Sequence, residues 1–222
     1  MSLVVIKDNH IKFMGTNYFV ANAQKVTIGA YGEKATPIFG QNKLEVAAHV
    51  PAPKLDGKVK IAGPFDIDVT RSSKSDFTTA VGASIKVVGF NGSQNEVYEE
   101  LTRKRLKLVQ LFVDEIPMMN AVNASPKVLA NLDRFGKDAR VAHELFVVME
   151  ASFATSFTSG TKSEITADAA GIVTVAVSGG KTVKGKDRLT LYPGMGLAYL
   201  LLKLDWKQGK IKDVDVDEWS LN

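Results

Sequence analysis

Hydrophobic and polar residues alternate along two long stretches of the chain, residues 59–89 and 145–177. In the first stretch, Phe65, Ile67 and Val69 occupy every second position, and a similar alternation follows the polar sequence RSSKSD. Successive side chains of a β-strand point to opposite faces of the sheet, so a period of two predicts half-buried strands. We therefore predict that each stretch forms two strands joined by a polar link.

The second stretch changes character partway along. Residues 144–157, ELFVVMEASFATSF, begin as a dense hydrophobic run and end as phenylalanines separated by Ser, Thr and Ala, with no turn residue between the two parts. The first part is typical of a protein core, and the second is a lighter alternation. We predict one continuous strand here, with a change of environment near Glu150.

Helix signals are few and local. Ser93 and Glu96 have the spacing of a capping box, which satisfies free backbone N–H groups at a helix start, and they predict a helix over about residues 94–105. Ser125 and Pro126 predict the start of a second helix that ends near residue 136. Because the strands occur in runs without regular strand–helix alternation, we predict an α+β fold. Its sheet is expected to be strongly bent and largely antiparallel, with a few short helices and two long amphipathic β-hairpins.

The composition is that of a globular chain. Of its 222 residues, 45% are hydrophobic and 23% are charged, which is enough to bury one core. We predict a single domain, residues 1–222, with a short acidic tail at about 207–222. The longest apolar stretch, residues 196–202, is too short for a transmembrane helix. The absence of cysteine excludes disulfides and thiolate metal sites.

The sequence holds no complete motif for catalysis or metal binding. His10, His49 and His143 lack the spacing of metal ligands. The sequence SGGKT at 178–182 lacks the earlier glycine of a phosphate-binding loop, and DVDVD at 213–217 lacks the glycine of a calcium loop. We therefore predict no enzymatic activity, no cofactor and no metal.

The charge balance is mildly basic. A net charge of +4 and a pI near 9.1 favour anionic surfaces, without separating lipid from nucleic acid. The most basic segment, TRKRLK at 102–107, has no interleaved aromatic residues on which bases could stack. We therefore expect no nucleic-acid partner.

Two apolar motifs resemble one protein family. Residues 143–157, HELFVVMEASFATSF, are similar to the gasdermin pore-forming domain at the strand that leads into a long insertion hairpin. The similar residues there are Leu145, Phe146, Val147, Val148, Met149 and Glu150. Residues 189–206, LTLYPGMGLAYLLLKLDW, resemble a later strand pair of that domain through Gly196, Leu197, Ala198 and Tyr199. The correspondence covers about residues 106–206 and is closest to short fungal or bacterial members that lack a large inhibitory domain.

The resemblance implies a function without a catalytic step. Such a protein is cytoplasmic when soluble and membrane-associated when active. It binds anionic membrane lipids, oligomerises with further copies or a related partner protein, and inserts β-hairpins as a transmembrane β-barrel pore, causing lytic cell death. The part of the chain that leaves the core is expected to begin just after Glu150.

The resemblance also assigns roles to residues. Each basic residue close to an anionic surface contributes about 1 kcal/mol of attraction. The lipid-binding candidates are Lys58, Lys60, Arg71, Lys74, Arg103, Lys104, Arg105 and Lys107. The membrane-inserting candidates are Phe65, Ile67, Val69, Val81, Ala83, Ile85, Phe153, Phe157, Ile165, Ala167 and Ala169.

A second hypothesis belongs to a different class of protein. Most alternating hairpins belong to half-buried sheets of soluble proteins. The chain is then a soluble, non-enzymatic α+β assembly or structural protein, such as a phage or secretion-apparatus component, whose hairpins pair with neighbouring subunits. Leakage of dye from lipid vesicles separates this hypothesis from perforation.

Overall fold

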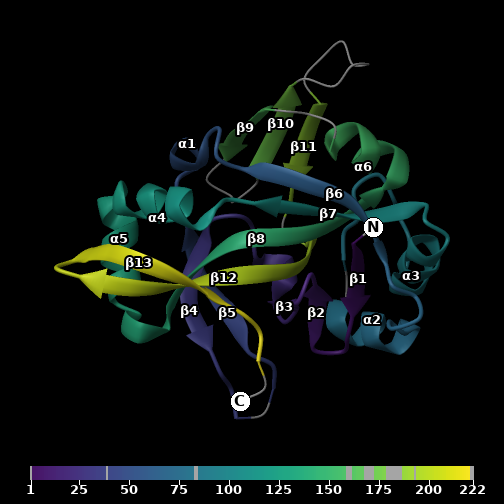
Figure 1. Ribbon diagram of the computed structural model, residues 1–222, viewed down its shortest axis with the longest axis horizontal. Coiled ribbons are helices and arrows are strands. Elements are labelled where there is room, and N and C mark those ends of the chain that lie inside the picture. The colour runs from purple at the N-terminus through teal and green to yellow at the C-terminus, as the bar shows by residue number, and fades with distance from the viewer. Residues whose placement is uncertain are drawn as a thin grey trace.

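The computed structural model describes residues 2–38, 40–82, 85–158, 162–167, 173–178, 187–192 and 194–220, without the side chains of 162–167, 173, 177, 178 and 187. Helices and strands are both abundant, which confirms the mixed α+β class (Figure 1). The strands of the main sheet are β1 (Leu3–Ile6), β2 (His10–Phe13), β3 (Thr16–Phe19), β4 (Ala30–Ala35), β5 (Lys43–His49), β6 (Lys60–Ile67), β7 (Leu106–Phe112), β8 (Ala139–Glu150), β12 (Gly196–Lys207) and β13 (Lys210–Asp217).

Part of the main sheet closes on itself. The strands β12, β3, β2, β1, β6, β7 and β8 are neighbours in that order, and β8 pairs with β12 to complete a barrel. Neighbouring strands in this ring are antiparallel except β1 and β6, where Leu3 lies opposite Asp66 in a parallel pair. The closed ring leaves β4–β5 and β13 to continue the sheet beyond it.

The long strands β8 and β12 belong both to the ring and to its extension. The first residues of β8 pair with β4, and the later ones pair with β7. Phe146 and Val148 contribute to the barrel interior, whereas Leu145 and Val147 pack on the other face. Burial on both faces explains why the sequence of this strand is a continuous hydrophobic run.

Aromatic rings fill the barrel interior. Phe146 of β8 contacts Phe13 and Tyr18, with ring centroids 5.4 Å and 5.0 Å away. Phe65 of β6 lies 4.6 Å from Phe13. Tilted and edge-on contacts of this kind stabilise a core beyond the area that they bury.

Two helices cover the outer face near the β12–β13 hairpin. The helix α4 (Glu115–Asn123) is fixed to β13 because the Asn123 side chain exchanges two hydrogen bonds with the backbone of Ile211, at 2.8 and 3.0 Å. The helix α5 (Pro126–Asp133) begins after Ser125, which confirms the predicted start. A 3-10 turn, η2 (Gly136–Asp138), follows it; two shorter elements elsewhere are η1 (Ala23–Lys25) and α1 (Ala52–Leu55).

The helix α3 (Gln94–Thr102) starts at the predicted capping box. The Ser93 and Glu96 side chains each accept a hydrogen bond from the other residue's backbone N–H. The helix ends a few residues before the predicted boundary at 105, because the chain turns at Lys104, which has a positive φ of 62°.

The predicted second strand of the 59–89 hairpin is wrong. Residues 74–81 form the helix α2 (Lys74–Val81), capped by reciprocal hydrogen bonds between Ser73 and Asp76. Phe77, Ala80 and Val81 are buried at helical spacing. The cap and this period of three to four outweigh the period-two alternation that begins at Val81. Ile85 follows outside any named element, and Ala83 lies outside the described residues.

The predicted continuous strand through residues 144–157 is also wrong. The strand β8 ends at Glu150 and the helix α6 (Ala151–Thr158) begins at the next residue. Phe153 and Phe157, four residues apart, stack at 5.7 Å on one side of this helix. The change in the sequence near Glu150 therefore marks a change of secondary structure.

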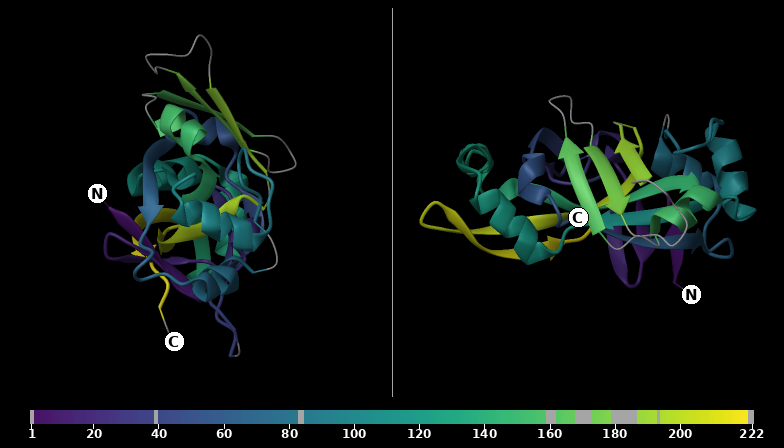
Figure 2. Two further views of the ribbon diagram at one scale, coloured as in Figure 1. Left: turned by 90° about the vertical axis from the view of Figure 1, so that its right-hand side faces the viewer. Right: turned by 90° about the horizontal axis from the view of Figure 1, so that it is seen from above.

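A separate three-stranded sheet follows α6. Its strands are β9 (Lys162–Ala167), β10 (Val173–Ser178) and β11 (Asp187–Leu191), with β10 in the centre. The backbone of Val175 lies opposite Ile165 on one side and Leu189 on the other. The predicted second strand of the 145–177 stretch is therefore wrong, because its residues form two separate strands, β9 and β10, that pair with each other. Figures 1 and 2 show this sheet at one side of the molecule, close to α1.

The predicted solvated acidic tail is structured over most of its length. Residues 210–217 form β13, which pairs with β12, and Asp217 forms ion pairs with Lys34 and Arg140. Trp219 is buried and stacks on His10 with ring centroids 4.5 Å apart. Ile211 and Val214 of β13 are buried, whereas Asp213 and Asp215 are exposed.

Candidate functional site

The neighbouring strands β6, β7, β8 and β12 have one end each on the same side of the main sheet: β6 and β8 end there, and β7 and β12 begin there. Leu106 at the start of β7 lies opposite Glu150 at the end of β8, and Gly196 at the start of β12 lies opposite Val147. In β6, Phe65 near the end of the strand lies opposite Leu108. The connections 68–105 and 151–195 therefore both leave from the same end of one antiparallel sheet.

The connection 68–105 folds as two helices against the barrel. Phe77 of α2 and Tyr98 of α3 are in ring contact at 5.6 Å, and the Tyr98 hydroxyl donates a hydrogen bond to the carbonyl of Ser72. The Ser72 hydroxyl in turn accepts from the backbone N–H of Ile6 at 2.8 Å. This connection is thereby joined to β1 as well as to its parent strands.

The connection 151–195 packs on the outer core. Phe157 of α6, with Val175, Leu189 and Leu191 of the small sheet, is buried in the cluster that covers the outer face of β8. Two backbone hydrogen bonds hold its end, one from Gly194 to the carbonyl of Gln24 at 2.6 Å and one from Lys86 to the carbonyl of Gly194 at 2.8 Å. The second of these bonds joins the two connections directly.

The predicted membrane-inserting residues of the first stretch are mostly inside this fold. Phe65 and Ile67 pack in the barrel interior, and Val81 is buried on α2. Ile85 is half-buried against the same cluster. Among the residues of this group that the structure describes, which leaves out Ala83, Val69 is the one that is largely exposed, at 52%. These positions do not form one apolar surface.

The candidates of the second stretch are only partly described. Phe157 is fully buried and Phe153 is half-buried on the helix α6. Ile165 and Ala167 lie in β9, where the backbone is described and the side chains are not. Ala169 lies outside the described residues. For the two phenylalanines, the expected strand face is replaced by a helix face.

Most of the predicted lipid-binding cations are paired with carboxylates. Lys60 pairs with Asp114, Lys74 with Glu99, Arg103 and Arg105 with Glu100, and Lys104 and Lys107 with Asp66. Lys58 donates to the carbonyl of Lys54, and neither Lys58 nor Arg71 has an ion pair within the described part of the chain. The cations near residue 104 therefore lie among carboxylates of comparable number.

Sequence reasoning missed the role of Asp66. It alternates with Phe65 and Ile67, which predicts a solvated carboxylate, yet it is only 4% exposed. The Lys107 ammonium contacts one of its oxygens and the Lys104 ammonium lies 3.8 Å from the other. A buried carboxylate is retained when cations compensate its lost hydration. The basic run at 102–107 was the available signal, because its cations need partners.

A polar network lies inside the barrel. The Tyr18 hydroxyl and the Gln110 amide both donate to Oε2 of Glu144, each at 2.6 Å. Burial, followed by the neighbouring Glu144 carboxylate, raises the pKa of Tyr18 above its ordinary value. This geometry keeps the tyrosine protonated and suits a structural contact that satisfies buried polar groups.

His143 is buried beside this network. Its Nδ1 lies 3.2 Å from the carbonyl of Val113 and must donate to it, because a carbonyl oxygen only accepts. Burial lowers the pKa of His143, so the neutral ring is favoured. Among the described residues, no group of three or more His, Asp or Glu side chains could hold a metal ion.

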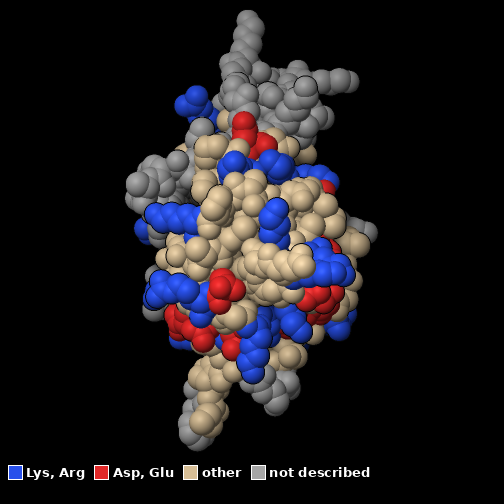
Figure 3. Space-filling view, turned by 90° about the vertical axis from the view of Figure 1, so that its left-hand side faces the viewer, with Lys and Arg blue, Asp and Glu red and all other residues tan. Residues whose placement is uncertain are grey.

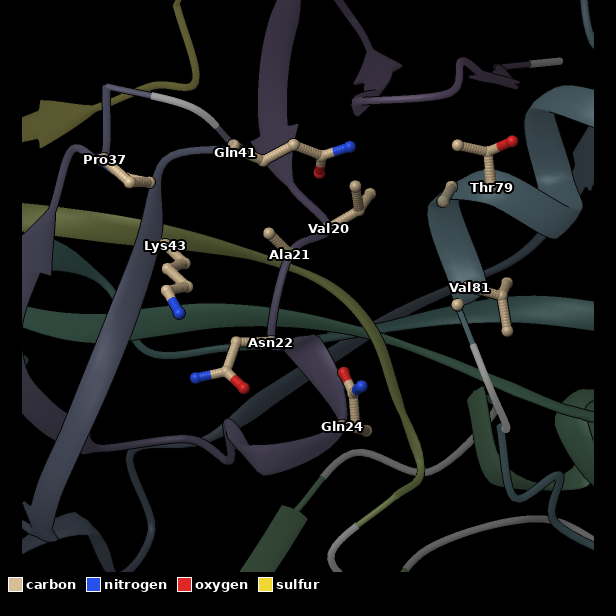
Figure 4. Close-up of a pocket in the computed structure, with 12 residues that line it drawn as sticks. Val20, Ala21, Asn22, Gln24, Pro37, Gln41, Lys43, Thr79 and Val81 are labelled. Atoms are coloured by element: carbon tan, nitrogen blue, oxygen red, sulfur yellow. The ribbon is translucent and has the colours of Figure 1, made fainter.

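A separate groove of about 410 Å³ lies between the β3–η1 connection, the β4–β5 loop and α2. Figure 4 shows Asn22, Gln24 and Gln41 around it together with apolar side chains. Lys43 is the ionisable residue of its lining, and its ammonium lies 2.7 Å from Glu45. The groove offers amide hydrogen bonds without a paired acid and base among its described lining residues.

The surface charge is mixed. Figure 3, which views the face at the left of Figure 1, shows Lys and Arg side chains beside Asp and Glu. No helix in the described ranges combines the length and the hydropathy that crossing a bilayer requires. Scans against models of protein families, curated proteins and solved structures return no match for this chain.

Proposed function

We propose that this chain is a gasdermin-like, membrane-perforating protein. It binds anionic lipid, oligomerises, and extends residues 68–105 and 151–195 as two amphipathic β-hairpins of a transmembrane barrel. The observation that carries the proposal is that both connections, one between β6 and β7 and one between β8 and β12, leave from the same end of these neighbouring strands. Extension of both connections would prolong four strands that are already neighbours.

The lengths of the connections suit this role. A strand of about 9–11 residues crosses a bilayer when tilted, so a hairpin needs about twenty residues and a turn. Residues 68–105 and 151–195 each exceed that length. The alternation of Val81, Ile85 and Val87 with smaller or polar residues would then give one lipid-facing and one water-facing side.

The helix α6 is suited to a change of conformation. Its sequence, ASFATSFT, is rich in Ser, Thr and Phe, which have modest intrinsic helix propensity, and Thr and Phe are favoured in strands. Burial of Ala154 and Phe157 against the outer core supplies much of its stability. Transfer of the phenylalanines into lipid would offset the loss of that burial, because both surroundings are apolar.

Oligomerisation follows from the chemistry of the bilayer. An inserted hairpin has unpaired N–H and C=O groups along its outer edges, and hydrocarbon offers them no hydrogen bonds. Neighbouring copies must therefore pair edge to edge until the barrel closes. We propose that the protein is cytoplasmic before this step and membrane-associated after it, and that the open pore is lytic to the cell.

Vesicle leakage tests the proposal. The purified chain is added to dye-loaded vesicles of phosphatidylcholine with or without phosphatidylglycerol, and release is followed together with the size of extracted protein complexes. We expect release from the anionic vesicles and large ring-like oligomers. Intact vesicles under both conditions would reject perforation, and regular oligomers formed without lipid would then support a soluble assembly protein.

A further inference from the structure

A pocket of about 440 Å³ lies at the strand ends from which both connections leave. Its walls come from the loop around Phe90, the C-terminal part of α3, the first residues of β7, and the junction of β8 with α6. On Figure 1 this is the right-hand side, where α3 and α6 flank the strand ends. The volume is within the range of small-ligand sites.

One wall of the pocket is cationic. Lys104 and Arg105 line it, and their side chains are 67% and 72% exposed. The Arg105 carbonyl accepts a hydrogen bond from Ala151 at 2.8 Å, which fixes the backbone of this wall to the start of α6. The guanidinium lies 3.5 Å from Glu100, a distance that leaves its remaining N–H groups able to donate to a ligand.

A carboxylate, that of Glu150, also lines the pocket. The Glu150 backbone N–H donates to the carbonyl of Val88. Its Oε1 accepts from the Ser152 hydroxyl at 2.8 Å. Within the described part of the chain, Glu150 has no ion pair, whereas Glu100, the other carboxylate of the lining, is paired with Arg103 and Arg105.

We propose that this pocket binds a phosphate that carries an amine, the phosphoethanolamine group. Arg105 and Lys104 hold the phosphate, Glu150 holds the ammonium, and Phe90 contacts the connecting carbons. A simple anion would be repelled by Glu150 and Glu100, whereas a ligand with both charges matches a lining that carries both signs. The source of the group is a membrane phospholipid, which rests on the proposed function, or a free phosphomonoester.

Binding there would act on both connections. The ligand would contact the start of β7, the end of β8 and the loop after α2 together. At these places the connections 68–105 and 151–195 join the strands of the main sheet. A headgroup would therefore bind at the place where both proposed hairpins would have to separate from the rest of the fold.

The experiment has a soluble arm and a membrane arm. Binding of O-phosphoethanolamine, inorganic phosphate and ethanolamine is measured by calorimetry. Sedimentation with vesicles compares phosphatidylcholine alone with mixtures that contain phosphatidylethanolamine or phosphatidylglycerol. The variants are Arg105→Gln and Glu150→Gln, and the matched controls Arg134→Gln and Glu33→Gln change exposed charges at the end of α5 and in β4, outside the pocket lining.

We expect O-phosphoethanolamine to bind and the two fragments to bind at least about tenfold more weakly, as for the loss of one charge-assisted contact. Glu150→Gln should weaken binding to phosphatidylethanolamine vesicles about tenfold and strengthen binding to phosphatidylglycerol vesicles. Arg105→Gln should weaken both, and the controls neither. Because the soluble arm uses the wild-type chain, a variant that fails to fold does not remove the test.

Each outcome is decisive. Binding of the soluble group alone identifies a free phosphomonoester as the ligand, and its competition with vesicles identifies the lipid. Binding in neither arm overturns the site, and so does binding to phosphatidylethanolamine vesicles that Glu150→Gln leaves unchanged. Leakage of phosphatidylglycerol vesicles without headgroup binding rejects the site and supports perforation. Headgroup binding without leakage supports the site and rejects perforation.

Discussion

Leu106, the first residue of β7, lies directly opposite Glu150, the last residue of β8. The chain reaches this point from α3 on one side and leaves it into α6 on the other. Because these residues are paired, the ends of the two connections are held together at one place in the sheet. Substitutions and labels in or near the two connections can therefore test whether these segments move.

A substitution at the half-buried Phe153 can test membrane insertion with little effect on folding. We expect Phe153→Asp to abolish dye release, because a charged side chain on the lipid-facing side of a barrel strand destabilises the inserted form. The same change should lower the free energy of unfolding less than Phe157→Asp, whose side chain is fully buried. Vesicle leakage and urea denaturation measure the two effects. Phe153→Leu is the control, and unfolding of Phe153→Asp would show that the residue is needed in the core.

A label on α6 reports whether this segment moves. The chain has no cysteine, so Thr155→Cys provides a single site on the exposed side of α6 for an environment-sensitive dye. We expect a blue shift and stronger emission when anionic vesicles are added, since proposed insertion brings residue 155 into or beside the bilayer. Lys203→Cys, exposed in the middle of β12, is the matched control and should not change. Equal changes at both sites would contradict movement confined to the connection.

Acidification should destabilise the fold through His143. Burial holds the pKa of His143 below its ordinary value of 6.5, so the unfolded chain binds a proton more readily. The free energy of unfolding should fall as the pH drops below about 6.5 and should level off below the folded-state pKa. Urea denaturation between pH 8 and 5 measures this slope. The slope should decrease in His143→Gln, and His10 and His49, whose pKa values burial also lowers, account for the remainder.

Gly196 is required for the closure of the barrel. A Cβ atom at this first residue of β12 would lie 2.5 Å from the carbonyl oxygen of Ala23 and 3.0 Å from Cδ1 of Leu145. Gly196→Ala should therefore shift the start of β12 away from η1 and lower the free energy of unfolding by about 1–3 kcal/mol, as overpacking does. Thermal and urea denaturation measure the loss. Lys203→Ala in the exposed part of the same strand should change stability by less than about 0.5 kcal/mol.

Some elements of this fold follow from local sequence. The capping box at Ser93 marks a true helix start because it is satisfied by residues three positions apart, and Pro126 marks another because its fixed φ suits the first turn of a helix. The hydrophobic run of 145–149 identifies a buried strand for a similar reason, since its composition shows burial on both faces. The mixed α+β class follows from such signals.

The conformation of the two connections was decided by tertiary packing. Phe153 and Phe157 fit a strand face at a spacing of two and a helix face at a spacing of four, so their pattern alone selects neither. In the fold they stack on α6 because Phe157 enters the outer core. Likewise Asp66 became buried only because Lys104 and Lys107, about forty positions away in the sequence, reach it across β6 and β7.

The sequence alone indicated a change of character near Glu150, because the composition changes there, but the strand that it predicted continued past the residue at which β8 ends. Only the packing of distant segments decided that residues 151–158 form a helix. A short segment that fits two periods takes the one whose apolar face finds a partner, since its own hydrogen bonds are too few to stabilise either conformation.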